Sequence, residues 1–190
     1  MEAAVTDEVL VAEGLGARTR RGWVFRDVDL VVRAGELVTI DGAAGSGRTS
    51  LLLALAGFFR TTAGTVRRTV RPALGFVAGV NEPEPGLTVA EHVEERLVLL
   101  GRAPFSLRAR RARALELLEG VPLRPDALGR DLDRLSAHRL GLVLASLHEP
   151  GIVFADDVDN GLSEVEQQEL HKALQETAAA VVVTARERLA

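Results

Sequence analysis

The residues best suited to chemistry lie in the glycine-rich run G-A-A-G-S-G-R-T-S. Its three glycines can take positive φ, so that successive N–H groups and the start of a following helix all face an anion. A threonine follows where a hydroxyl can bind Mg²⁺. We therefore predict a phosphate site here; the alternative is a glycine-rich turn before a buried helix. The residues predicted to line the site are Gly42, Ala43, Ala44, Gly45, Ser46, Gly47, Arg48, Thr49 and Ser50.

One residue departs from the G-x-x-x-x-G-K-[ST] pattern of phosphate loops. Arg48 stands where that pattern has lysine. A guanidinium keeps the positive charge, but it is planar and bulkier, and it aims its donors differently from an ammonium. We expect Arg48 to contact phosphate; the alternative is that it points to solvent or pairs with a nearby carboxylate.

A pair of carboxylates follows the apolar run Ile152–Ala155. An acid at the C-terminal end of a strand in a parallel sheet lies beside the phosphate loop, where it can hold Mg²⁺ or its water shell. Asp156 and Thr49 are therefore the predicted metal ligands. Asp157 is the predicted catalytic residue, since a second acid could polarise an attacking water. Two aspartates alone also open ordinary turns, and only the upstream phosphate loop makes this pair specific.

Hydrophobic periodicity indicates which elements position these residues. An apolar strand-like run (37–40) precedes the loop, and a helix-forming run (51–55) follows it. Further strands are predicted at 9–11, 28–32, 65–70, 73–78, 152–155 and 180–184. The run N-E-P-E-P-G at 81–86 is predicted to be a loop.

Helix signals are concentrated in the second half of the chain. Capping boxes at Thr88 with Glu91, and at Ser163 with Glu166, predict helices to about Leu100 and Ala178. Other helices are predicted at 106–118 and from Ser136, as N-cap, to about His148. Because no strand is indicated between 88 and about 134, we expect one domain over 1–190, in which a helical subdomain (88–135) is inserted into an α/β core (1–87 and 136–190).

Composition excludes several classes of protein. The 190 residues suffice for one domain with a sizeable core, and the absence of cysteine excludes disulfides and thiol metal sites. The acidic start M-E-A-A-V-T-D-E-V is not expected to be a signal peptide, and the longest apolar runs are too short to span a bilayer. A net charge of −4 argues against binding to nucleic acid. The arginines of 106–118 could contact phosphates or anionic lipid, but a solvated helix face is the preferred interpretation.

Taken in order, these landmarks resemble an ATP-binding cassette (ABC) transporter nucleotide-binding domain over almost the whole chain. The runs that carry the resemblance are V-F-R-D-V-D-L-V-V-R-A-G-E before the loop, G-F-V-A-G and L-T-V-A-E-H-V in the middle, R-L-S near 135, I-V-F-A-D-D-V-D-N-G-L-S, and V-V-V-T-A-R-E near the end. The resemblance implies an α/β fold: a P-loop NTPase core with a mostly parallel sheet, an N-terminal antiparallel β subdomain and the helical insertion.

The same resemblance implies ligands and partners. The ligands would be ATP and Mg²⁺. The partners would be an integral membrane permease subunit and a second nucleotide-binding domain, identical or different, with no nucleic acid involved. The implied location is cytoplasmic, on the inner face of the cell membrane through the permease.

The departures from the family pattern concern catalysis. Leu135 and Asp156 are 21 positions apart, roughly three fewer than in the family, and three helical residues correspond to about 4.5 Å. The simplest alignment deletes G-G-Q of the signature directly after Ser136, which should leave the phosphate bound by a partner cassette poorly held. The other aligned departures are Thr19 for the adenine-stacking aromatic, which Trp23 or Phe25 could replace, Gly79 for the Mg²⁺-sensing glutamine, Asp157 for the catalytic glutamate, Ser163 for the D-loop aspartate and Ala185 for the switch histidine.

Three functions remain in competition. The first is the ATP-binding subunit of a membrane transporter with weak or no hydrolysis, which we predict; whether the chain is an enzyme stays open. The second is a non-catalytic scaffold or regulator of a membrane complex that binds nucleotide or only a partner. A soluble cassette acting on ribosomes or DNA is disfavoured, because the chain shows no second cassette, long insertion or basic domain.

Overall fold

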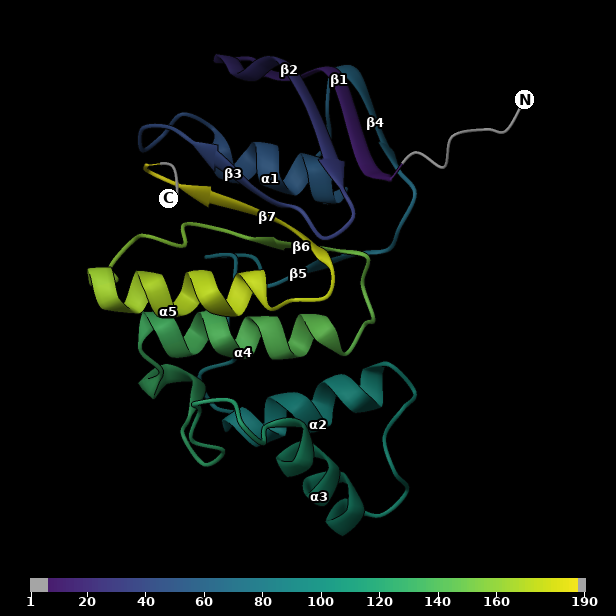
Figure 1. Ribbon diagram of the computed structural model, residues 1–190, viewed down its shortest axis with the longest axis vertical. Coiled ribbons are helices and arrows are strands. Elements are labelled where there is room, and N and C mark those ends of the chain that lie inside the picture. Colours follow the sequence, from purple (N-terminus) through teal and green to yellow (C-terminus); the bar gives the residue numbers. More distant parts are fainter. Residues whose placement is uncertain (1–6, 188–190) are drawn as a thin grey trace.

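A parallel and an antiparallel β-sheet, with helices between and beside them, make up the computed structural model, which describes residues 7–187 (Figure 1). The acidic start discussed above lies mostly outside these residues. The elements in chain order are β1 (Glu8–Thr19), β2 (Gly22–Arg33), β3 (Leu37–Asp41), α1 (Arg48–Ala56), β4 (Ala63–Arg68), β5 (Pro72–Leu74), α2 (Val89–Leu99), α3 (Leu107–Leu117), the 3₁₀ turn η1 (Gly129–Asp131), α4 (Arg134–Ser146), β6 (Ile152–Ala155), α5 (Glu164–Gln175) and β7 (Ala180–Ala185).

The parallel sheet carries the site and has the strand order β3-β7-β6-β5. Every residue of β6 and β7 is buried, as expected for central strands covered on both faces. Helix α1 packs between this sheet and the antiparallel one, whereas α4 and α5 cover the opposite face (Figure 1). The predicted fold class, an α/β core with an N-terminal antiparallel sheet and added helices, is confirmed.

The antiparallel sheet has the order β2-β1-β4 and is longer than the sequence indicated. The predicted strands 9–11 and 28–32 are only parts of β1 and β2, which pair from Glu8↔Arg33 to Thr19↔Gly22. The register of this pair shifts between Ala12 and Leu15 and again between Leu15 and Ala17. Because each shift interrupts the alternation of apolar residues, the pattern identifies only the regular portions of these strands.

Helices α2 and α3 follow the parallel strand β5 and pack on each other and on α4. Their shared core contains Val93 and Leu97 from α2, Ala114 from α3 and Leu140 from α4. The capping boxes predicted at the starts of α2 and α5 are confirmed. In the arginine-rich α3, Ala114 is the buried residue.

Several other predicted boundaries are wrong, among them those of β4, which spans Ala63–Arg68 rather than 65–70. Strand β5 ends at Leu74, not near 78, because the Asn81 side chain donates hydrogen bonds to the carbonyl groups of Leu74 and Gly75, at 3.2 and 2.6 Å. Ser136 is not an N-cap: α4 begins at Arg134, and the carboxylate of Asp133 accepts a bond from the Ser136 N–H at 2.7 Å. Helix α5 ends at Gln175 rather than near 178.

Protonation of His138 should make the fold sensitive to acid. This α4 residue is 1% exposed, its ring lies 4.8 Å from that of Phe76, and burial together with the charge of Arg134 lowers the pKa of His138 to about 4. The unfolded chain therefore takes up the proton first as pH falls, so stability should be complete above pH ~6.5 and decline toward pH ~4.

We expect this group alone to lower the free energy of unfolding by about 2 kcal/mol between pH 7 and pH 5. Urea titrations at both pH values measure this loss of stability. The free energy of unfolding of the variant His138→Leu should not show this decrease. An equal loss in the variant would assign the acid sensitivity to other groups.

No helix among residues 7–187 is long and apolar enough to cross a membrane.

Candidate functional site

The glycine loop joins the end of β3 to the start of α1, where the sequence predicts a phosphate site. Gly42, Gly45 and Gly47 have φ values of 151°, 79° and 88°, which glycine adopts without a Cβ penalty. Gly47 is the N-cap of α1 and provides no side-chain cap. The N–H groups of the first helical turn therefore remain available to an anion, and the helix dipole favours negative charge there.

Gly47 is also required by packing. A Cβ at this position would lie 2.3 Å from the carbonyl oxygen of Val24 in β2. The antiparallel sheet thus presses on the loop through β2, and only a residue without a side chain fits. Gly45, by contrast, has open space where its Cβ would be.

The two predicted metal ligands are brought together. The Thr49 hydroxyl donates to Asp156 Oδ2 at 2.8 Å, and the Thr184 hydroxyl donates to Asp156 Oδ1 at 2.5 Å. Asp156 is only 3% exposed, and its N–H donates to the Phe76 carbonyl at 2.9 Å. A hydroxyl and a carboxylate oxygen beside the glycine loop suit Mg²⁺, which is usually held by one or two protein oxygens together with substrate phosphates and waters.

The Arg48 guanidinium is bonded to two groups of the same chain, a carboxylate and a backbone carbonyl. Its Nη2 lies 3.1 Å from Asp157 Oδ1, and its Nη1 donates to the carbonyl oxygen of Ala185. The guanidinium side chain is 10% exposed. The structure therefore has the arrangement given above as the alternative, in which Arg48 pairs with a nearby carboxylate.

Asp157, the predicted catalytic residue, is hydrogen-bonded through both carboxylate oxygens and through its N–H. Besides Arg48, it accepts a bond from Asn160 Nδ2 at 3.0 Å through Oδ2, and its N–H donates to the Thr184 hydroxyl at 2.8 Å. Its φ of 55° lies in the left-handed region, which is rare for residues other than glycine. Both carboxylate oxygens of Asp157 thus accept hydrogen bonds from the protein in this structure.

The two aromatic residues considered for stacking differ in exposure. Phe25 is buried against Phe59, with ring centroids 6.5 Å apart. Trp23 is 45% exposed, and the guanidinium of Arg18 lies 5.6 Å from the centre of its ring. Of the two rings, that of Trp23 is therefore the one open to solvent, as stacking on a ligand requires.

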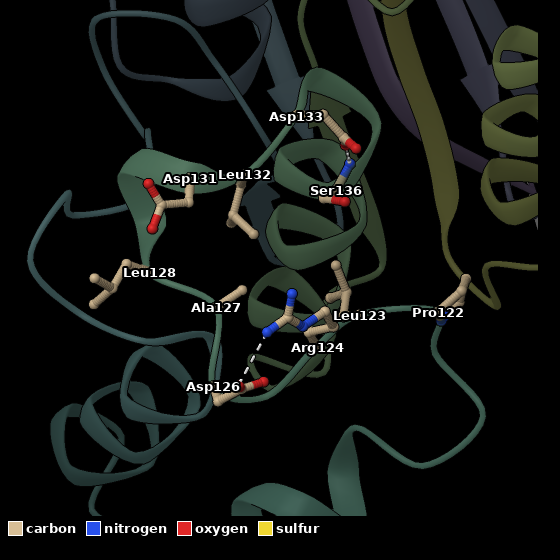
Figure 2. Close-up of a pocket in the computed structure, with 10 residues that line it drawn as sticks. All are labelled: Pro122, Leu123, Arg124, Asp126, Ala127, Leu128, Asp131, Leu132, Asp133 and Ser136. Atoms are coloured by element: carbon tan, nitrogen blue, oxygen red, sulfur yellow. Dashed lines mark hydrogen bonds and ion pairs between the residues drawn. The ribbon is translucent and has the colours of Figure 1, made fainter.

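The N-terminus of α4 is closed by an acidic side chain that the sequence interpretation missed. Figure 2 shows the Asp133 carboxylate bonded to the N–H of Ser136. Asp133 borders a pocket of about 570 Å³ whose lining residues all lie between positions 122 and 136. Asp126 and Asp131 also line this pocket (Figure 2). The aspartate three positions before Ser136 is the N-cap signal that would have identified it. Its carboxylate therefore accepts the hydrogen bond that the Ser136 N–H could otherwise donate to another acceptor.

The comparisons with known proteins agree with this geometry. The sequence profile of the ABC transporter family matches residues 25–160. The zinc import ATP-binding protein ZnuC of Jannaschia sp. (strain CCS1) is 31% identical over 190 residues, covering 94% of this chain and 73% of that protein. The lipoprotein-releasing system ATP-binding protein LolD of Alcanivorax borkumensis is 34% identical over 159 residues, covering 74% of this chain and 68% of LolD.

Solved structures share the fold at lower identity. An ATP-binding cassette dimer in a post-hydrolysis state with ADP and Pi superposes with a TM-score of 0.75 at 24% identity, covering 94% of this chain and 88% of that one. The cbiO1 protein of Clostridium perfringens, part of the ABC transporter complex cbiONQ, gives a TM-score of 0.75 at 17% identity, with coverage of 95% and 79%. With its profile match, its relatives and its phosphate-loop geometry, the chain belongs to the ABC transporter family as an ATP-binding domain.

Proposed function

We propose that this chain is the ATP-binding subunit of an ABC-type membrane transporter, and that it binds Mg-ATP with weak or no hydrolysis. One contrast carries the proposal. The binding elements, an uncapped α1 N-terminus and the Thr49–Asp156 pair, are in place, whereas the predicted base Asp157 is one methylene shorter than glutamate and Ala185 has no imidazole.

The loop residues 42–50 would hold the phosphates through backbone N–H groups and the Ser46, Thr49 and Ser50 hydroxyls. Thr49 and Asp156 would hold Mg²⁺, which when bound neutralises phosphate charge. Arg48 would supply a further positive charge once it leaves Asp157. These assignments use only groups that already lie at the end of β3, the start of α1 and the end of β6.

Weak hydrolysis follows from what stands at the catalytic positions. Ala185, where the family has its switch histidine, offers only its carbonyl group, which accepts from Arg48. Gly79, where the family has glutamine, has no side chain and a φ of 71°. At α4, Asp133 bonds the Ser136 N–H that could otherwise face the phosphate of a partner cassette.

The names of the relatives support the choice of partners. ZnuC is an import ATP-binding protein, and LolD belongs to a lipoprotein-releasing system; one structural neighbour is a cassette dimer. We therefore propose an integral membrane permease subunit and a second cassette as partners, and a location at the inner face of the cell membrane through the permease.

The second candidate is a non-catalytic scaffold or regulator of a membrane complex. The Arg48–Asp157 pair favours this second function, because an arginine whose charge is already paired with a carboxylate of the same chain needs no nucleotide phosphate as a partner. The two functions differ in whether Mg-ATP binds at all, and that difference is directly measurable.

Isothermal calorimetry of the whole chain with ATP, with and without Mg²⁺, tests the proposal. We expect binding in the micromolar to millimolar range that Mg²⁺ strengthens. Mg²⁺ strengthens ATP binding by some factor in the wild-type chain. Thr49→Val and Asp156→Asn should each reduce that factor at least about tenfold, the scale of one lost hydrogen bond to a charged group. Thr65→Val in β4 and Asp131→Asn in η1 are matched controls and should bind normally. Absence of heat with millimolar Mg-ATP and folded protein would favour the scaffold.

A further inference from the structure

The turn after β6, residues 157–160, is held by arginines from three other parts of the chain. Arg48 in α1 binds Asp157, at 3.1 Å. Arg134, the first residue of α4, donates from Nε to the Asn160 carbonyl at 3.3 Å, and Arg186 after β7 donates to the Asn160 side-chain oxygen. Asn160 in turn donates to Asp157 at 3.0 Å. The turn therefore links the glycine loop to the N-terminus of α4 through continuous polar contacts.

A second contact ties α4 to the metal-ligand side of the site. The Arg134 guanidinium lies 4.9 Å from the centre of the Phe76 ring, and the Phe76 carbonyl accepts the N–H of Asp156 at 2.9 Å. Arg134 thus contacts both the turn and the residue bonded to Asp156. A displacement of the turn therefore changes the contacts of Arg134.

The ion pair with Arg48 helps to hold Asp157 in a strained backbone conformation. Asp157 has a φ of 55°, a left-handed conformation that costs an ordinary residue free energy and persists where surrounding contacts enforce it. Arg48 is mostly buried, so it needs an anionic partner at all times. An exchange of one anion for another satisfies Arg48 and leaves the turn without its ion pair.

We infer that Arg48 is a triphosphate-sensing latch on residues 157–160, an inference that rests on the proposed binding of Mg-ATP. Without nucleotide, Arg48 holds Asp157. In phosphate loops the cation at this position reaches the β- and γ-phosphates, so with a triphosphate Arg48 exchanges Asp157 for the terminal phosphate. The turn is then released, and Arg134 at the start of α4 loses a fixed partner. A diphosphate lacks the γ-phosphate and carries one negative charge fewer, so it competes less strongly with Asp157, and Arg48 remains on Asp157.

Hydrogen exchange of the whole chain tests the latch independently of turnover. The amides of Val158 and Asn160 donate to the carbonyls of Thr184 and Asp157 at 3.0 and 3.2 Å, so their exchange reports opening of the turn. We expect the imido analogue of Mg-ATP, which is not hydrolysed, to accelerate their exchange by about tenfold, the equivalent of one charge-assisted hydrogen bond. Mg-ADP should leave it unchanged.

A variant tests the same contact without nucleotide. Arg48→Gln should accelerate exchange in 157–160 by a similar factor in the free protein, and combining it with Asp157→Asn should add little, since both remove one interaction. Arg67→Gln, which breaks the exposed 3.7 Å pair with Glu8, is the matched control and should have no effect there.

The outcomes separate the latch from the proposed function. If calorimetry shows that the analogue binds while exchange is equal in the ADP and triphosphate states, the latch is wrong and the proposed function stands. Unchanged exchange in free Arg48→Gln also rejects the latch. If no nucleotide binds, both the proposed function and the latch are rejected.

Discussion

ATP turnover by the purified chain should be far slower than the median enzyme rate of about 10 s⁻¹. Asp157 is one methylene shorter than glutamate, and its carboxylate is bonded to Asn160 in the same turn, so it must reach farther to an attacking water than a glutamate would. Ala185 provides no imidazole, and Asp133 occupies the start of α4. Loss of a general base alone typically costs 10²- to 10⁴-fold in rate, and loss of an electrostatic donor about 3 kcal/mol.

Phosphate release measured under saturating Mg-ATP checks this expectation. Asp157→Glu combined with Ala185→His should raise the rate, although not to the level of complete cassettes, because the shortened signature remains. Matched changes away from the site, Asp131→Glu with Ala178→His, should leave the slow rate as it is. A wild-type rate of several per second that Asp157→Asn eliminates would show that the chain assembles a competent site in another way.

Gly47→Ala should destabilise the domain and abolish nucleotide binding. The new Cβ would lie 2.3 Å from the Val24 carbonyl oxygen, in a residue whose φ is 88°. Neither β2 nor α1 can move freely, because both are part of the same buried core. Left-handed backbone alone costs an alanine about 1–2 kcal/mol, and the clash adds to that.

Gly45→Ala separates the two effects, since its φ of 79° imposes a similar backbone cost but its Cβ would meet open space. Urea unfolding should therefore show Gly47→Ala to be at least about 2 kcal/mol less stable than Gly45→Ala, the size of an overpacking penalty. Calorimetry with Mg-ATP on the same proteins measures binding. Equal stabilities would mean that β2 yields to the added methyl group and that packing does not demand glycine at position 47.

Locally encoded features could be predicted from the sequence. The loop glycines, the capping boxes of α2 and α5, and the apolar strands β3, β6 and β7 depend on residues within a few positions of one another. The juxtaposition of Thr49 and Asp156 also followed, because the C-terminal ends of the strands in a parallel sheet all lie at one edge, although β7 separates β3 from β6. Where the register shifts, in β1, or where a distant side chain intervenes, as Asn81 does at β5, the local pattern gave wrong ends.

By itself, the sequence determined the glycine loop between β3 and α1, the acidic pair after β6 and the ABC family of the chain. Only the tertiary structure decided what Arg48 does. Its partners Asp157 and Ala185 are 109 and 137 positions away, and which anion a buried guanidinium binds depends on the distance to each one. The same holds for position 47, which requires glycine because of the close Val24 carbonyl in the antiparallel sheet as well as because of the local turn. Local sequence sets backbone preference, whereas long-range packing sets which charges and atoms meet.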